Sequence, residues 1–230
     1  MNLQNKSINF LGDSITFGVG TSDESHCFVS LLQHQYHLKA ARNYGISGTR
    51  YAKQCRASDD PECDRDFCSR VCEMDADADV VIVFGGTNDF GHGDAPLGSS
   101  SDRTKDTFHG ACHTLYSSLI ERYPNSTIVV LTPLHRIEED SPFGDGQKIQ
   151  PGRPLRAYVD IIRSAAAYYD LPVLDLFDHH SLDPNVPLIQ ERYLPDGLHP
   201  NDAGHRILAN IIGEYLENLL VRKKASGLDV

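Results

Sequence analysis

The chain contains no tryptophan, only two methionines, and fewer basic than acidic residues. Its 21 Lys and Arg residues stand against 32 Asp and Glu residues, which gives a formal net charge of -11. This excess of negative charge argues against nucleic acid or an anionic membrane surface as a partner, so we expect a small-molecule substrate. Aromatic residues make up 8% of the chain and none is tryptophan, which gives no sign of a separate carbohydrate-binding platform.

Long apolar runs are also missing. Val80–Phe84 and Ile128–Leu131 are the longest candidates, and both have the length of strands. A membrane helix needs about 20 apolar residues, so no transmembrane segment is predicted. The N-terminus lacks a charged head followed by a long apolar region, and Ile8–Leu11 reads as a core strand that a cleaved leader would remove. We therefore expect a cytoplasmic protein.

Six cysteines are present, and four of them lie close together between residues 55 and 72. Without an export signal, free thiols are the default expectation. A disulfide pair or a zinc site is the alternative, although the spacing departs from the paired C-x₂₋₄-C pattern of structural zinc sites. His179-His180 is interpreted as a loop pair. We expect no metal and no cofactor. The cysteines are Cys27, Cys55, Cys63, Cys68, Cys72 and Cys112.

Short apolar runs alternate with helical patterns along the 230 residues, of which 40% are hydrophobic. This alternation predicts a parallel sheet with helices on both faces, and the length suits one domain over residues 1–220. Strands are predicted over Ile8–Leu11, Ala41–Tyr44, Val80–Phe84, Thr127–Leu131 and Pro172–Asp175. Helices are predicted over Phe28–His37, Thr104–Tyr123, Leu155–Tyr169 and Asn201–Leu220.

Two long segments interrupt this pattern. Residues 51–79 are acidic and carry cysteines, and residues 137–154 are rich in Gly, Pro, Asp and Glu. Insertions of this length are usually functional lids or disordered loops. Residues 221–230 are expected to form a flexible tail.

Four polar segments rich in glycine follow strands or precede the last helix. Ligands of open parallel sheets bind beyond the carboxyl ends of the strands, so we expect these segments to meet at one edge. They are Gly12–Ser14, Gly45–Gly48, Gly85–Asp89 and Asp196–His199.

Ser14 is the candidate nucleophile. It follows an apolar strand and Gly12-Asp13, at a predicted strand-to-helix turn. A serine at such a turn presents its hydroxyl to the cleft, and its amide can donate to a developing oxyanion. The alternative is a helix cap, because Asp and Ser are favoured at N-caps.

His199 is the candidate base. A histidine activates a serine when its far nitrogen is held by an acceptor, and the Asp196 carboxylate can fold back across Gly197 to reach it. Pro200 disfavours helical backbone at His199. The alternative is an ordinary turn at Asp196-Gly197 followed by a surface histidine.

Donors for an oxyanion are expected from two other loops. Asn88 follows a buried strand, and its side-chain amide is a neutral donor. Gly48 can present a backbone N–H that no side chain covers. Both segments are also typical of turns and loops. Asp89 is expected to order the loop of Asn88.

Three further residues are candidate substrate contacts. Asp13 adjoins the candidate nucleophile, and His135-Arg136 follows Pro133 at the end of a strand. At that position the two side chains would line the cleft and meet substrate oxygens. A surface location for His135 and Arg136 is the alternative.

The order of the four segments resembles the GDSL/SGNH hydrolase family over nearly the whole chain. The resemblance implies a flavodoxin-like three-layer α/β/α sandwich with a central, mostly parallel sheet. It also implies a metal-independent esterase with a serine triad and an oxyanion hole. The matching residues are Ser14, Asp196 and His199 for the triad, and Ser14, Gly48 and Asn88 for the hole.

The resulting hypothesis is a serine acylhydrolase that cleaves small acyl esters, such as O-acetyl groups on carbohydrates, through an acyl-enzyme. A lysophospholipase or thioesterase acting on longer acyl chains is the first alternative. A binding protein without catalytic activity on the same fold is the second, and the intact set of motif residues argues against it. The oligomeric state stays open.

Overall fold

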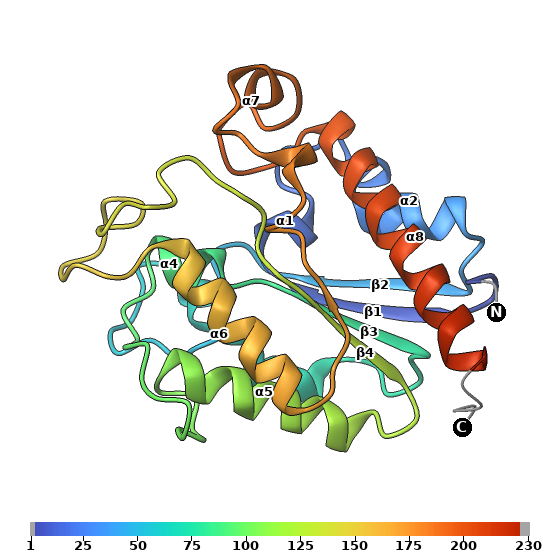
Figure 1. The fold of residues 1–230 in the computed structure, drawn as a ribbon, viewed down its shortest axis with the longest axis horizontal. Coiled ribbons are helices and arrows are strands. Elements are labelled where there is room, and N and C mark those ends of the chain that lie inside the picture. The colour runs from blue at the N-terminus through green and yellow to red at the C-terminus, as the bar shows by residue number, and fades with distance from the viewer. Residues whose placement is uncertain (1–2, 226–230) are drawn as a thin grey trace.

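A five-stranded parallel sheet forms the centre of the computed structural model, which describes residues 3–225 (Figure 1). The strands lie in the order β2-β1-β3-β4-β5, and every neighbouring pair is parallel. This is the flavodoxin-like order, so the predicted fold class is confirmed. The strands are β1 (Ser7–Gly12), β2 (Ala40–Gly45), β3 (Val80–Phe84), β4 (Thr127–Leu131) and β5 (Val173–Leu174).

Helices cover both faces of the sheet (Figure 1). α2 and α8 pack together on one face, and α5 and α6 pack together on the other. These helices are α2 (Phe28–Gln35), α5 (Phe108–Arg122), α6 (Leu155–Tyr168) and α8 (Asp202–Ala225). The shorter elements are η1 (Glu24–His26), η2 (Pro61–Asp64), α3 (Phe67–Arg70), η3 (Val71–Glu73), η4 (His180–Leu182) and α7 (Pro187–Tyr193).

β3 is apolar at every position because both of its faces are covered. Val80, Ile82 and Phe84 pack in the core with α2 and α8, while Val81 and Val83 pack in the core with α5 and α6. Side chains alternate between the faces of a strand, so a strand that is covered on both faces needs a continuous apolar run.

The order in which the chain adds strands to the sheet reverses after β2, next to the carboxyl ends of β1 and β3. β1 lies between β2 and β3, so the chain leaves β1 toward one edge and crosses to the other. Two short helices begin here, α1 (Ser14–Phe17) and α4 (Thr87–Gly91). The strand-to-helix turn at Ser14 was predicted, whereas α4 was not, because five residues cannot display a helical period.

The 51–79 insertion is neither a disordered loop nor a lid. It folds into η2, α3 and η3, and buries Tyr51, Phe67 and Met74 in the core beneath α5. The rings of Tyr51 and Phe67 lie 4.8 Å apart between centroids. Phe67, Val71 and Met74 stand at i, i+4 and i+7, so a helical period is present in this short stretch, although it was not predicted.

The 137–154 insertion is irregular and lies across α4. The Asp145 amide donates to the Gly91 carbonyl at 2.8 Å, and the Lys148 ammonium donates to the carbonyls of Asp89 and Gly93. These contacts place the insertion beside α4, the short helix that contains Asn88.

Two predicted helix boundaries differ from the structure by four residues or more. α5 begins at Phe108 rather than at Thr104, because the Thr107 side chain accepts from the Gly110 amide and caps the helix. α8 continues past Leu220 to Ala225, so the expected flexible tail is helical over its first five residues. Residues 226–230 lie outside the described part. Between residues 3 and 225, none of the helices has both the length and the apolar character needed to span a bilayer.

We expect Phe67→Ala to lower the free energy of unfolding by about 3–5 kcal/mol, because it leaves a cavity in the core. Phe143→Ala is the matched control. Phe143 belongs to the other insertion and is 44% exposed, whereas Phe67 is fully buried. Its truncation is expected to cost less than about 1 kcal/mol. Urea unfolding measures both, and equal losses would show that the 51–79 segment is not part of the core.

Candidate functional site

Ser14, His199 and Asp196 form a continuous hydrogen-bonded chain. Ser14 Oγ lies 2.9 Å from His199 Nε2, and His199 Nδ1 lies 2.6 Å from Asp196 Oδ2. Ser14 is the first residue of α1, and Asp13 caps this helix by accepting from the Ile15 amide. The arrangement can withdraw a proton from the serine while a carboxylate stabilises the imidazolium.

Asp196 is held as a carboxylate by the loop that it begins. Its Oδ1 accepts from the backbone amides of Leu198 and His199 at 2.9 and 2.7 Å. Partial burial raises the pKa of Asp196, but the hydrogen bonds from His199 and Leu198 outweigh it and leave the pKa below its usual value. Gly197 has φ +80°, and a Cβ there would lie 2.4 Å from Ile137, so this turn requires glycine.

The three candidate donors surround the same corner. The Ser14 amide is among the first of α1, and such amides have no partner within their helix. Asn88 donates one amide hydrogen to the Thr49 carbonyl at 3.0 Å, which orients its side chain. An amide group carries two hydrogens, so a second one is left for a ligand. Gly48 has φ +73°, and a Cβ there would lie 2.6 Å from Cys63 Sγ.

The His92 side chain contacts the backbone of the Gly48 loop. Its Nε2 lies 3.3 Å from the Gly48 carbonyl, and its Nδ1 lies 3.1 Å from Asp145 Oδ2. His92 lies outside the four motif segments, so it was not predicted from the sequence. His92 follows Asn88 by four residues, which is the spacing that puts two side chains on one face of a helix, and that spacing is the signal that could have found it.

Arg70 is a second residue that the sequence did not reveal. Its guanidinium donates to the carbonyls of Tyr44 and Gly12, at 2.7 and 3.0 Å, and to the Thr49 hydroxyl at 3.0 Å. Burial lowers its pKa to about 10. Arg70 thereby ties together the ends of β1 and β2 and the loop that follows β2. It lies in the 51–79 insertion among other charged residues, where no local pattern marks it.

The Asp89 side chain binds the start of the 51–79 insertion, although it was expected to order its own loop. Its carboxylate is 4% exposed and accepts from the amides of Tyr51 and Ala52 at 2.9 and 3.0 Å. Burial raises its pKa to about 6 despite these two hydrogen bonds. Asp89 therefore fixes the start of the 51–79 insertion against α4, one residue away from Asn88.

The three candidate substrate contacts lie in buried positions. Asp13 is 2% exposed beneath the turn that carries Ser14. Arg136 is 7% exposed, and its guanidinium contacts Thr87 and forms an ion pair with Asp145. His135 is 8% exposed and bonds to Glu139. This burial favours a supporting role for Asp13 and Arg136 over direct contact with a substrate.

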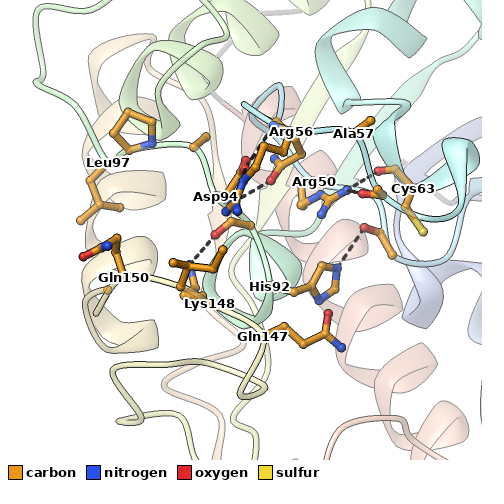
Figure 2. A pocket seen from close by; sticks show the side chains of 18 of the residues that line it. Arg50, Arg56, Ala57, Cys63, His92, Asp94, Leu97, Gln147, Lys148 and Gln150 are labelled. Atoms are coloured by element: carbon orange, nitrogen blue, oxygen red, sulfur yellow. Dashed lines mark hydrogen bonds and ion pairs between the residues drawn. The ribbon is translucent and has the colours of Figure 1, made fainter.

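A cavity of about 1180 Å³ opens beside Gly48 and His92, between the two insertions (Figure 2). The lining mixes polar side chains with apolar ones such as Leu97 and Ile149, and Figure 2 shows Gln147 next to His92.

Most of the cations that line the cavity are engaged within the protein: Arg56 pairs with Asp94, and Lys148 donates to backbone carbonyls. Arg153 also lines the cavity and has no ion pair among the described residues. The cavity therefore offers polar contacts without a concentration of unpaired charge.

The comparison with protein families agrees with this geometry. The model of the GDSL-like Lipase/Acylhydrolase family matches residues 10–207. The chain belongs to this family. Its members are named lipases and esterases, so the protein is a carboxylic ester hydrolase, as predicted. The match includes all four motif segments.

Relatives cover most of the chain. The GDSL lipase Rv0518 of Mycobacterium tuberculosis is 29% identical over 92% of this chain and 81% of its own length. A Lactobacillus plantarum protein of known structure is 28% identical, with a TM-score of 0.79 over 94% of this chain and 99% of its own. A putative GDSL-like lipase from Bacteroides uniformis shares the fold at 18% identity, with a TM-score of 0.63 over 93% and 96% of the two chains.

The buried Asp13 carboxyl predicts a pH-dependent stability. Burial raises its pKa from 3.8 to about 6, so the native state binds the proton more tightly than the unfolded state does. The contribution of Asp13 to stability should therefore fall as pH rises from 4 to 6, by up to roughly 3 kcal/mol. Asp13→Asn keeps an oxygen for the Ile15 amide and removes this titration.

We expect Asp13→Asn to gain stability relative to the wild type as pH rises from about 4 to 7. Urea unfolding at several pH values measures the difference. Asp89 titrates in both proteins, and its charge adds to the effect of burial in raising the pKa of Asp13, so the difference reports Asp13 together with this coupling. Two stability profiles that run parallel across this range would contradict the assignment.

Proposed function

We propose that Ser14 is the nucleophile of a Ser-His-Asp triad that hydrolyses carboxylic esters through an acyl-enzyme. The observation that carries this proposal is the unbroken chain of hydrogen bonds from Ser14 Oγ through the His199 ring to Asp196. Asp196 accepts from Nδ1, which leaves the Nε2 lone pair directed at the serine hydroxyl.

Acyl transfer follows in two steps. His199 takes the Ser14 proton as the serine oxygen attacks the ester carbonyl, and the tetrahedral intermediate then collapses as His199 protonates the leaving alcohol. In the second step His199 takes a proton from water, which attacks the acyl-enzyme and releases the acid. Asp196 stays ionised and stabilises the imidazolium in both steps.

The negative charge of the tetrahedral intermediate would be bound by the Ser14 and Gly48 amides and the Asn88 side chain. Each of these donors is oriented before substrate arrives: Asn88 by the Thr49 carbonyl, and Gly48 through the His92 contact. One such donor typically contributes about 2.7–4 kcal/mol to lowering the barrier.

We infer that the substrate carries a small acyl group on a polar alcohol, such as an O-acetyl carbohydrate. Polar side chains in the mixed lining of the cavity beside Gly48 support this inference, because a hydroxyl-rich alcohol can bond to amides such as that of Gln147. Two proteins that share the fold point the same way, an esterase active on acetylated mannans and an acetyl xylan esterase. The name lipase of the Mycobacterium relative favours longer acyl chains as the second candidate.

Fluorophosphonate labelling tests the nucleophile. We expect stoichiometric labelling of the wild-type chain and loss of labelling in Ser14→Ala, because the probe forms its bond with an activated serine. Ser101→Ala is the control, since Ser101 is exposed in another loop and should keep wild-type labelling. Persistent labelling of Ser14→Ala would overturn the assignment.

A panel of acetyl, butyryl and octanoyl esters of one alcohol tests the acyl preference. We expect kcat/KM to be highest for the acetyl ester and to fall with chain length, by about tenfold or more for octanoyl. An octanoyl optimum would instead favour the lipase candidate. Absence of turnover on all three esters, with fluorophosphonate labelling intact, would point to another acyl substrate.

A further inference from the structure

Three potential metal ligands meet beyond the carboxyl ends of β4 and β5. His135 follows β4, whereas His180 and Asp183 lie in and directly after η4, which follows β5. One donor atom from each of these side chains lies within 4.8 Å of the other two. Segments separated by more than 40 residues thus bring two imidazoles and a carboxylate together.

His135 has one nitrogen bound and one free. Its Nδ1 lies 2.9 and 3.0 Å from the two carboxylate oxygens of Glu139. Its Nε2 is buried and has no hydrogen-bond partner among the residues that the structure describes. A carboxylate on the far nitrogen is the usual support of a metal-binding histidine, because it fixes the tautomer and the ring orientation.

Asp183 and His180 complete the set. Asp183 Oδ1 accepts from the backbone and side-chain nitrogens of Asn185 at 2.9 and 3.0 Å. The other oxygen, Oδ2, lies 3.9 Å from His180 Nδ1. The side chain of His180 is 76% exposed and its ring stacks beside that of His135, at 5.4 Å between centroids. It is therefore free to rotate toward a ligand.

We propose that His135, His180 and Asp183 bind a divalent transition metal of the zinc type. Imidazole nitrogens and a carboxylate oxygen are ligands of Zn²⁺, with bonds of about 2.0–2.2 Å. In a tetrahedral site such bonds put neighbouring ligand atoms about 3.4 Å apart. Rotation of the exposed His180 ring brings the cluster to this spacing, and water takes the fourth position.

The competing occupant of His135 Nε2 is a proton. A metal must displace this proton, so occupancy should grow as pH rises above neutrality. Because the proton and the metal compete for Nε2, metal binding is measured in a slightly alkaline buffer.

The site would join the segment after β4 to the segment after β5. Asn185 already donates to the Arg136 carbonyl at 3.4 Å, and the Ile137 amide donates to the Gly197 carbonyl at 2.9 Å. A metal there would therefore brace the wall against which the His199 loop rests. The proposal does not depend on the role of Ser14, because it concerns binding and not turnover.

Calorimetric titration of the EDTA-treated full chain with Zn²⁺ at slightly alkaline pH tests the site. We expect one saturable site in the wild type, weakened by about tenfold or more in His180→Ala, because a ligand is removed. His179→Ala is the matched control. The neighbouring His179 is equally exposed and belongs to no ligand cluster among the described residues, so its loss should leave the affinity unchanged.

Glu139→Gln provides an independent readout, because it keeps the three ligands and weakens the support of His135. An affinity loss of about 10–100-fold is expected. Co²⁺ in place of Zn²⁺ should give a visible absorption spectrum that is lost in His180→Ala and retained in His179→Ala. Absence of saturable binding in the wild type, or equal affinity in the wild type and His180→Ala, would overturn the proposal.

Discussion

Parallel pairing of β1 with β2 on one side and β3 on the other is the constraint on which this protein depends. It brings the ends of three strands to one edge, where the Ser14 turn, the Gly48 loop and the Asn88 loop all begin. The His199 loop completes the group from 185 residues away in the chain. Strand order therefore creates the site, and the hydrogen bond between Ser14 and His199 is its consequence.

Buried charge holds these loops in place. Arg70 binds the carbonyl ends of β1 and β2, and Asp89 binds the amides that begin the 51–79 insertion. Burying an ionised group is unfavourable unless hydrogen bonds compensate, and the raised pKa of Asp89 shows that here the compensation is incomplete. Burial of these charged groups therefore lowers the stability of the fold at the positions that orient the proposed oxyanion donors.

The two insertions serve this edge in different ways. The 51–79 segment supplies core through Phe67 and a tether through Arg70, and Phe67 packs so closely on Gly85 that a Cβ there would lie 2.6 Å from its ring. The 137–154 segment supplies the other wall of the cavity and bonds across α4 through Lys148. Substrate selection is therefore proposed to rest on the insertions, and bond cleavage on the four motif segments.

The sequence by itself determined the fold class, the central strands and the residues of the candidate triad. Apolar runs such as Val80–Phe84 and motifs such as Asp196–His199 are local patterns, legible without knowledge of the fold. Only the tertiary structure decided what Arg70, His92 and the cluster around His135 contact, and that Asp13 is buried. Those roles arise between segments far apart in the chain, where no spacing along the sequence encodes the distance.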